Sequence, residues 1–299
     1  MSLTPASTGD RVPPHAYFVV SAVFHYLGPA FAVLLFARVD ALGVAWLRIA
    51  AAAVVFAVWR RPWRHRRDLG RATRGTLVAW AAVLAGMNSV FYLALERLPL
   101  GTVAAVEFVP VLALAALAAR TPRNLAALAG AVAGVALLAD VRLAAEPLGL
   151  AYAAANAVLF AAYIVLGHRV ARDAALPGID GLAISMLLAA VLALPLGIAA
   201  AAPALTDPVA LAAGVGVGVC SSVIPYVFDQ LAMARLPRAT YALLVSLLPA
   251  TATVIGVVVL TQIPTRAELA GVALVVAGVA VHRDRARDRA GAGGGAGAG

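Results

Sequence analysis

The stretch RLPLGTVAAVEFVPVLALAAL, residues 97 to 117, carries one carboxylate, Glu107, in a run that is otherwise apolar from Leu98 to Ala119. A similar stretch, RLPRATYALLVSLLPATATVI, occupies residues 235 to 255. Both stretches begin with Arg-Leu-Pro and have a threonine five residues later. An apolar run of about 20 residues is long enough to cross a bilayer as a helix. The pair therefore predicts membrane-spanning helices in a duplicated chain.

Composition indicates the same class of protein. Of the 299 residues, 63% are hydrophobic and 12% are charged, whereas soluble domains have about 45–50% apolar and about 25% charged residues. Spanning helices satisfy their own backbone polar groups in lipid. An outer-membrane barrel would need short alternating strands, and the long unbroken apolar runs argue against it.

Short polar breaks divide the chain into ten predicted spans with no room for a soluble domain between them. We therefore predict an all-α membrane protein of ten transmembrane helices. The predicted spans lie near residues 16–37, 41–59, 76–96, 100–119, 124–139, 148–168, 179–202, 208–233, 239–261 and 266–282.

Further similarities extend the duplication to two units of five spans. The block AYFVVSAV (16–23) parallels AYAAANAV (151–158), which makes Ser21 and Asn156 equivalent, and LAGAVAGVALLA (128–139) parallels LAGVALVVAGVA (269–280). Because five is odd, the second unit must be upside down relative to the first. We expect an inverted-topology repeat with its interface near the midplane of the membrane.

The domain boundaries follow from these units. The first five-helix repeat is expected at 16–145 and the second at 146–282. Residues 1–15 are rich in Ser, Thr and Pro, and residues 283–299 end in GAGGGAGAG. Both tails are predicted to be disordered.

The distribution of arginine predicts the orientation. All 23 basic residues are Arg, and the formal net charge is +9. If the 60–75 link is cytoplasmic, both termini and most arginines share its side, as the positive-inside rule requires. Anionic lipid is the expected partner of the Arg60–Arg74 loop, and this explanation is preferred over nucleic-acid binding. The arginines on the other side are Arg38, Arg97, Arg142 and Arg266.

Glu107 is the first candidate functional residue. At about 1.5 Å per residue, it lies roughly 10 Å into a helix that begins on the outer side, where contact with lipid would be costly. A buried carboxyl group can exchange protons near neutral pH, so Glu107 is a candidate for proton coupling. The alternative is a structural ion pair with Arg48, which lies at a similar depth. The two roles are compatible if the charged ends of a substrate compete for the pair.

A second group of candidates surrounds a proline in the eighth span. Asp229 and Gln230 lie close to Pro225 and Tyr226. Because proline removes one backbone hydrogen bond, it exposes a carbonyl that could bind a substrate ammonium group. Asp229 could form an inner gate, or it could simply be solvated at the cytoplasmic mouth.

Several amides and phenols complete the candidate set. Asn88 and Tyr92 are four residues apart and share a helix face, as do Asn156 and Tyr163, which are seven apart. Such groups suit the amino and carboxyl ends of an amino acid, although hydrogen bonding between helices is the alternative. His25 could relay protons or serve as a packing residue.

Other functional motifs are not found in the sequence. GVGVGVC (214–220) lies within a predicted span and lacks the strand context of a phosphate loop. Cys220 is the only cysteine, and no metal-ligand pattern or nucleophile motif accompanies it. We therefore expect no metal, no cofactor and no enzymatic activity.

Three stretches resemble a known family. GMNSVFYLALERLPLGTVAAVEF (86–108), NAVLFAAYIVLGHR (156–169) and IPYVFDQLAMARLP (224–237) are similar to helices of the threonine/homoserine exporter group, within the EamA branch of the drug/metabolite transporter superfamily. The resemblance implies export of small hydrophilic metabolites, typically neutral amino acids, by proton exchange. The family's arginine in helix two matches Arg48, and its glutamate near the start of helix four matches Glu107.

The resulting prediction is a proton-coupled secondary transporter of the bacterial inner membrane that works by alternating access. The alternatives are an exporter of drug-like or nucleoside-type compounds, or a membrane enzyme in which Glu107 and His25 are catalytic. The expected partners are a small-molecule substrate, protons and membrane lipids. Whether the chain forms a homodimer stays open.

Overall fold

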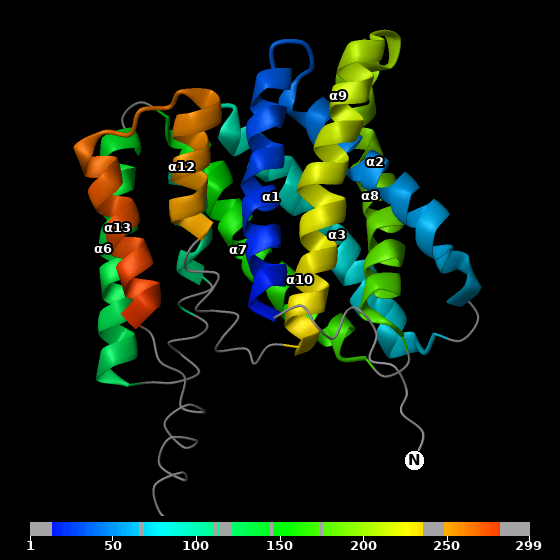
Figure 1. Ribbon diagram of the computed structural model, residues 1–299, viewed down its shortest axis with the longest axis horizontal. Helices are drawn as coiled ribbons and strands as arrows, with labels where there is room; N and C mark the ends of the chain where they lie inside the picture. Colours follow the sequence, from blue (N-terminus) through cyan, green and yellow to red (C-terminus); the bar gives the residue numbers. More distant parts are fainter. Residues whose placement is uncertain are drawn as a thin grey trace, which may run out of the picture.

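The computed structural model describes residues 14–65, 69–110, 113, 121–143, 146–173, 176–235 and 248–281. Within these ranges the chain is helical and has no strand (Figure 1). This confirms the predicted all-α class. The helices are α1 (Pro14–Leu35), α2 (Ala41–Arg60), α3 (Arg71–Leu95), α4 (Leu100–Glu107), α6 (Pro122–Leu143), α7 (Pro147–Ala171), α8 (Gly178–Thr206), α9 (Pro208–Gly218), α10 (Ile224–Arg235), α12 (Leu248–Leu260) and α13 (Arg266–Val281).

Two short elements interrupt this pattern. A 3-10 turn, Pro62–His65, follows α2, and a π-helical turn, Val219–Val223, joins α9 to α10. Because α9, the π turn and α10 are continuous, they form one rod across the bundle. Single π turns inside helices are frequent at functional sites.

The predicted spans and the observed helices agree in position. Among the described residues, six helical stretches are long and apolar enough to cross a membrane, and Leu248–Leu260 is a shorter apolar helix. That all ten predicted spans cross the membrane stays a prediction. The six stretches are Ala16–Leu35, Ala41–Arg60, Arg71–Leu95, Pro147–Ala171, Gly178–Thr206 and Pro208–Ala232.

The predicted tails and two of the predicted spans are only partly covered. The N-terminal tail was predicted to reach residue 15, but α1 already begins at Pro14, a residue tolerated in the first turn of a helix. Residues 1–13 and 282–299, which hold the rest of both predicted tails, lie outside the described ranges, as do 236–247 and most of 111–120.

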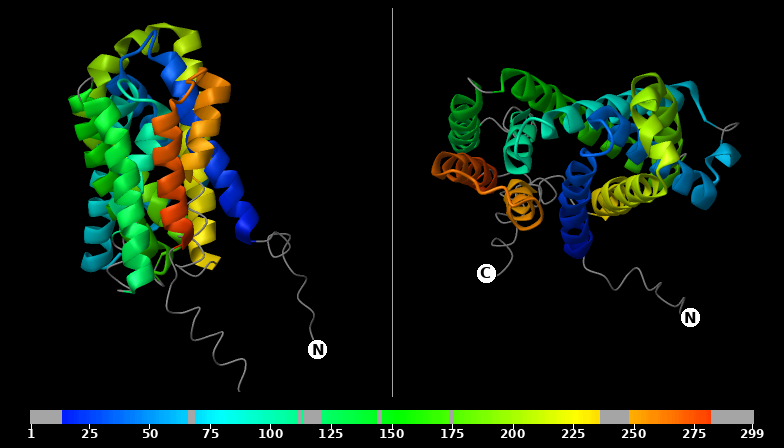
Figure 2. Two further views of the ribbon diagram at one scale, coloured as in Figure 1. Left: turned by 90° about the vertical axis from the view of Figure 1, so that its left-hand side faces the viewer. Right: turned by 90° about the horizontal axis from the view of Figure 1, so that it is seen from above.

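The helices lie side by side in a bundle (Figures 1 and 2). α1 begins and α13 ends at the same face, which we call the terminal face, and the α1–α2 and α12–α13 links lie at the opposite face. Seen from above, α13, α12, α1 and α10 form one row (Figure 2). α2 packs along α8, α3 along α7, α6 along α13, α1 along α10, and α4 against α12.

Glycines bring α2 and α8 into close contact. A Cβ atom on Gly43 would collide with the backbone of Ala200, and one on Gly197 would collide with Trp46. Small residues of this kind let membrane helices approach closely. The resulting contact fixes α2, the helix that carries Arg48.

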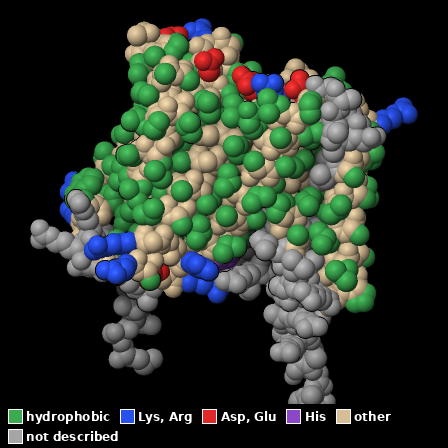
Figure 3. All heavy atoms as spheres, turned by 180° about the vertical axis from the view of Figure 1, so that it is seen from behind, with side chains coloured by type: hydrophobic (Ala, Val, Ile, Leu, Met, Phe, Trp, Pro, Cys, Tyr) green, Lys and Arg blue, Asp and Glu red, His purple; other side chains and the backbone are tan. Residues whose placement is uncertain are grey.

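The outer surface of the bundle suits a lipid environment. Charged side chains gather toward its two ends, and hydrophobic side chains cover the surface between them (Figure 3). Large apolar side chains point outward along this surface, including Val58 (72% exposed), Leu196 (59%) and Val258 (74%). An apolar surface this extensive marks a membrane interaction.

Candidate functional site

Glu107 lies at the end of α4, inside the bundle, and is 2% exposed. Its Oε1 atom accepts a hydrogen bond from Asn156 Nδ2 of α7 (2.9 Å), and its Oε2 atom accepts one from Tyr26 Oη of α1 (3.1 Å). The carboxylate is therefore held by two neutral donors from two other helices. It does not face lipid, which agrees with the expectation for a carboxylate at this depth.

Arg48 of α2 is also buried, at 3% exposed. Its Nε atom donates to Ser222 Oγ and its Nη2 atom to the Ser221 carbonyl oxygen, both at 2.7 Å. Two tyrosines lie next to the guanidinium group. Arg48 Nη2 donates to Tyr226 Oη (3.3 Å), and Arg48 Cζ lies 5.8 Å from the centroid of that ring. Arg48 Nη1 lies 3.5 Å from Tyr92 Oη, and Cζ lies 5.4 Å from the Tyr92 ring centroid. Neutral oxygens and ring faces thus surround this guanidinium group.

The local sequence explains why Ser221 is available to Arg48. Proline has no backbone N–H, so Pro225 leaves the carbonyl of Ser221, four residues earlier, without its helical donor. Gly218, one turn before, allows close approach because a Cβ atom there would lie 2.8 Å from the Arg48 carbonyl oxygen. The sequence suggested that the carbonyl freed by proline could bind a substrate ammonium group. In the structure Arg48 donates to this carbonyl, and binding of a substrate ammonium group there stays a prediction.

Arg48 and Glu107 do not form the ion pair that was the alternative role for Glu107. Among the described residues, the ion pairs within 4.0 Å include neither of these two side chains. A cation and an anion are thus buried in the same bundle, each satisfied by neutral groups.

Both charged residues line one small cavity. Its volume is about 10 Å³, which is room for about one water molecule. Two buried acceptors, Asn88 Oδ1 and Asn156 Oδ1, have no hydrogen-bond partner within the described part of the chain. The cavity therefore offers one cationic group together with several acceptors. It is lined by His25, Arg48, Met87, Asn88, Phe91, Glu107, Asn156 and Tyr226.

Aromatic side chains form a layer next to this cavity. The His25 ring lies 5.3 Å from Tyr26, 6.1 Å from Phe160 and 6.3 Å from Tyr226 between centroids. Tyr163 lies 5.9 Å from Phe160 and 5.3 Å from Tyr226. His25 thus has ring neighbours on three sides and also reaches the cavity, so packing and polar roles both remain compatible with its position.

Asp229 of α10 lies outside this cavity. Its Oδ1 atom accepts a hydrogen bond from Ser21 Oγ (2.5 Å), and its Oδ2 atom accepts one from Tyr163 Oη (3.3 Å). Asn156 and Tyr163 share a face of α7, as their spacing predicts, but they bind different carboxylates. The carboxylates and their donors therefore form two groups. The Glu107 group is Glu107, Tyr26 and Asn156, and the Asp229 group is Asp229, Ser21 and Tyr163.

Four residues that bind Arg48, Glu107 or Asp229 were not predicted as site residues from the sequence. Tyr26 follows His25 directly but was not singled out, and Ser221 and Ser222 were not considered. Ser21 was recognised as the repeat equivalent of Asn156, and this equivalence could have identified it as a carboxylate partner. For the two serines of the π turn, the signal was Pro225 four residues beyond Ser221.

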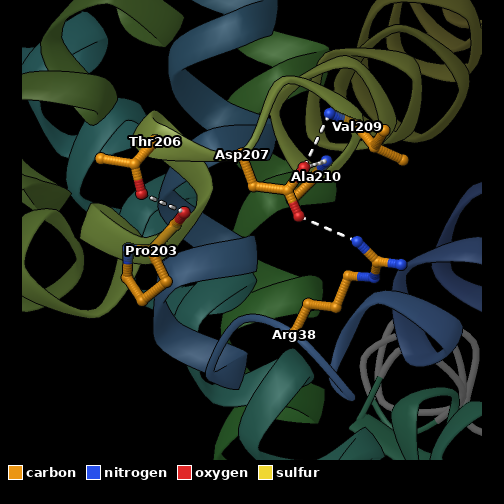
Figure 4. Close-up of polar contacts among 6 residues, drawn as sticks. All are labelled: Arg38, Pro203, Thr206, Asp207, Val209 and Ala210. Carbon is orange, nitrogen blue, oxygen red and sulfur yellow. Dashed lines mark hydrogen bonds and ion pairs between the residues drawn. The ribbon is translucent and has the colours of Figure 1, made fainter.

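Two ion pairs join the ends of α2 and α8. At the terminal face, Arg60 Nε donates to Asp180 Oδ1 at 2.6 Å. At the opposite face, Asp207 Oδ2 accepts from Arg38 Nη1 (2.9 Å), and Asp207 Oδ1 caps α9 by accepting from the N–H groups of Val209 and Ala210 (Figure 4). The Ala210 N–H and the Arg38 guanidinium hold the pKa of Asp207 below its usual value. In the last turn of α8, Thr206 Oγ1 donates to the Pro203 carbonyl (Figure 4).

These features define a multi-pass helical membrane protein with a buried, oppositely charged site. The EamA-like transporter family model matches residues 147–282. The threonine/homoserine exporters RhtA of Salmonella typhimurium (strain LT2) and of Escherichia coli (strain K12) are each 31% identical to this chain over 253 residues. Each alignment covers 84% of this chain and 84% of the exporter. The chain belongs to the EamA-like transporter family.

A solved protein structure supports the fold independently. It has a TM-score of 0.60 and 22% sequence identity, and the match covers 89% of this chain and 96% of the other. At this level of identity the likeness concerns the fold alone.

Proposed function

We propose that this protein is a secondary active transporter that exports small hydrophilic metabolites, with neutral amino acids such as threonine and homoserine as substrates. The observation that carries the proposal is the cavity that contains Arg48 and Glu107 without an ion pair between them. A zwitterionic amino acid has the complementary charges. The names of the RhtA relatives favour the same substrate class.

Each end of the substrate has a partner in the cavity. Arg48 binds the carboxylate, because a guanidinium group pairs with carboxylates in a fork geometry. Glu107 and the unpartnered Asn88 Oδ1 and Asn156 Oδ1 atoms accept hydrogen bonds from the ammonium group. Buried charges without an opposite charge, and buried acceptors without a donor, favour a ligand that provides the missing charge and the missing donor.

Proton coupling follows from competition for Glu107. A proton and an ammonium group cannot both neutralise the same carboxylate, so binding of one promotes release of the other. Tyr26 and Asn156 hold the carboxylate by neutral donors that remain available in either state. Export is then driven by protons that enter as the amino acid leaves.

Binding requires the helices around the cavity to move apart. The cavity of about 10 Å³ holds about one water molecule, which is far less than an amino acid needs. We infer an alternating-access cycle in which the bundle opens to one side and then to the other. The charged residues that line the cavity favour a zwitterion over apolar drug-like compounds as the substrate.

The inverted repeat is part of the same proposal. In the proposed repeat, α1 corresponds to α7, α2 to α8, α3 to α10, α4 to α12 and α6 to α13. Helix contacts support the repeat, because exchanging corresponding helices converts the α1–α10 contact into the α7–α3 contact. The α2–α8, α4–α12 and α6–α13 contacts each pair a helix with its own counterpart. We further propose that all ten spans cross the bacterial inner membrane, with both termini and the Arg60–Arg74 loop on the cytoplasmic side, next to anionic lipid.

A counterflow assay tests the function. Purified protein is reconstituted into liposomes, which are loaded with unlabelled threonine or homoserine and then given a trace of the labelled amino acid outside. Preloading should accelerate uptake of label about tenfold over unloaded vesicles, because only a carrier exchanges its ligand between faces. Liposomes without protein are the control. Equal uptake with and without preloading, for both amino acids, would contradict the proposed function.

A further inference from the structure

The Glu107 and Asp229 groups are built in the same way from opposite halves of the chain. Ser21 and Asn156, which occupy equivalent repeat positions, each donate to a carboxylate of the other half: Asn156 to Glu107 and Ser21 to Asp229. Each group also contains a tyrosine from the first helix of the half that holds the carboxylate. Tyr26 of α1 donates to Glu107, and Tyr163 of α7 donates to Asp229. The carboxylate, the crossing donor and the tyrosine therefore occur twice.

The two carboxylates lie at mirrored depths. Glu107 is seven residues from the start of α4 at Leu100, which at 1.5 Å per residue is roughly 10 Å from the opposite face. Asp229 is six residues from the end of α10 at Arg235, or roughly 9 Å from the terminal face. Counted along its own helix, each carboxylate is thus six or seven residues from the helix end at its own face.

Aromatic side chains connect the two groups. Tyr163 belongs to the Asp229 group and stacks with Phe160 and Tyr226, whereas His25 connects Tyr226 to Tyr26 of the Glu107 group. Two of these rings, His25 and Tyr226, also line the cavity that holds Arg48 and Glu107. A ligand that passes from one carboxylate to the other would therefore pass these aromatic side chains.

The residue that follows Asp229 has a buried amide that makes no hydrogen bond within the described part of the chain. Gln230, the next residue, is 2% exposed, and neither atom of its amide has a hydrogen-bond partner within the described residues. Buried amides without a partner are rare in folded proteins. The Gln230 Oε1 atom lies beside Gly178 at the start of α8, so a polar ligand entering from the terminal face would supply the missing hydrogen bonds.

We propose that Asp229, with Ser21 and Tyr163, forms a second ammonium-binding site that serves the terminal face. This inference rests on the proposed function and adds an earlier step to it. The ammonium group of the amino acid binds Asp229 first, the aromatic layer opens, and Glu107 and Arg48 then take the two charged ends. The two carboxylates thus act in turn on the same ligand group, one for each face of the membrane.

Sided kinetics test this inference. Liposomes containing the full chain are sorted by orientation with a tag at the carboxyl terminus, and threonine counterflow is titrated from each face. Asp229→Asn should raise the half-saturating threonine concentration at the terminal face about tenfold, since the variant loses a charge-assisted hydrogen bond to the ammonium group. The value at the opposite face should change less than about twofold. Glu107→Gln is the matched control from the other half and should show the reverse asymmetry.

Milder variants keep the test decisive if Asp229→Asn fails to fold. Ser21→Ala and Tyr163→Phe each remove one donor to Asp229 and should weaken binding about threefold at the terminal face only. Equal effects at both faces, or unchanged affinity at the terminal face, would overturn the inference. So would a change in pH dependence with unchanged affinity, because Asp229 would then bind protons alone. If the unmodified protein shows no threonine counterflow from either face, the proposed function fails instead.

Discussion

Arg48 and Arg60 come from the same helix, and their surroundings differ in kind. Arg60 lies at the terminal face, where the carboxylate of Asp180 binds it directly. Arg48 lies roughly 18 Å further along α2 and is bound by hydroxyl groups, a carbonyl oxygen and tyrosine rings. The protein neutralises the first charge itself, whereas in the proposed function a ligand neutralises the second.

This difference has an energetic basis. A buried charge is costly unless hydrogen bonds or an opposite charge stabilise it. The Ser221 carbonyl, released by Pro225, and the Ser222 hydroxyl supply enough hydrogen bonds to hold Arg48 inside the bundle. Because these groups are neutral, Arg48 keeps its attraction for a carboxylate. We therefore expect changes at Arg48 to affect transport, and changes at the ends of α2 to affect stability.

The largest effect is expected from Arg48→Gln. Loss of the guanidinium group should reduce threonine counterflow about 10- to 100-fold, since the hydrogen bonds lost involve charged groups worth about 1.5–3 kcal/mol. Arg48→Lys keeps the charge but loses the fork, so it should be intermediate. Arg60→Gln, from the same helix, is the matched control and should retain counterflow. Equal loss in the Arg48→Gln and Arg60→Gln proteins, both eluting as folded protein on size exclusion, would contradict the distinction.

The second effect concerns proton coupling at Glu107. Glutamine can still accept hydrogen bonds from Tyr26 and Asn156, but it cannot exchange a proton. In Glu107→Gln, an inwardly directed proton gradient should therefore stimulate export less than about twofold, whereas the unmodified protein should respond fully. The measurement is efflux of labelled threonine from vesicles with and without the gradient. Unchanged stimulation in the variant would show that Glu107 does not couple proton movement to transport.

A smaller and purely structural effect is expected at the terminal face. Asp180 is 3% exposed and Arg60 binds it at 2.6 Å, so Asp180→Asn should lower the free energy of unfolding by about 1–3 kcal/mol. Thermal unfolding in detergent measures this change. Threonine affinity of the folded protein should stay the same. An altered affinity without a loss of stability would place Asp180 in the transport site.

The smallest effect is expected at Asp207, on the exposed opposite face. Asparagine is also a good N-cap but lacks the charge, so Asp207→Asn should lower the unfolding temperature only slightly at neutral pH. The pKa of Asp207 is lowered by the Ala210 N–H and by Arg38. Its ionised form therefore stabilises the fold at neutral pH, and this contribution is lost as pH falls through that pKa. Unfolding temperatures of the variant and the unmodified protein should converge in acid, and divergence would contradict this sign.

Much of this arrangement could be predicted from the sequence. The positions of the helices follow from apolar runs, and the burial of Glu107 and Arg48 follows from their place in such runs. The predicted equivalence of Ser21 and Asn156 follows from the proposed repeat. These features depend on local composition or on similarity within the chain, so one sequence contains them.

The partners of the buried charges could not be predicted in the same way. Helical spacing shows which residues share a face, but it does not show which neighbouring helix that face meets. For this reason Asn156 and Tyr163 were expected to act together, although they bind different carboxylates. The π turn likewise changes the direction of Ser221 and Ser222 in a way that 3.6-residue periodicity does not contain.

The most direct test of the central claim compares ligands that each lack one charged end. Binding of threonine, threonine amide and N-acetylthreonine to the purified protein is measured by isothermal titration calorimetry. The unmodified protein should bind threonine at least about tenfold more tightly than either derivative, because each derivative leaves one buried charge unmatched. Arg48→Gln should abolish the preference over the amide, and Glu107→Gln should abolish the preference over the N-acetyl derivative. If both variants kept the preferences of the unmodified protein, Arg48 and Glu107 would not recognise the two ends of the substrate.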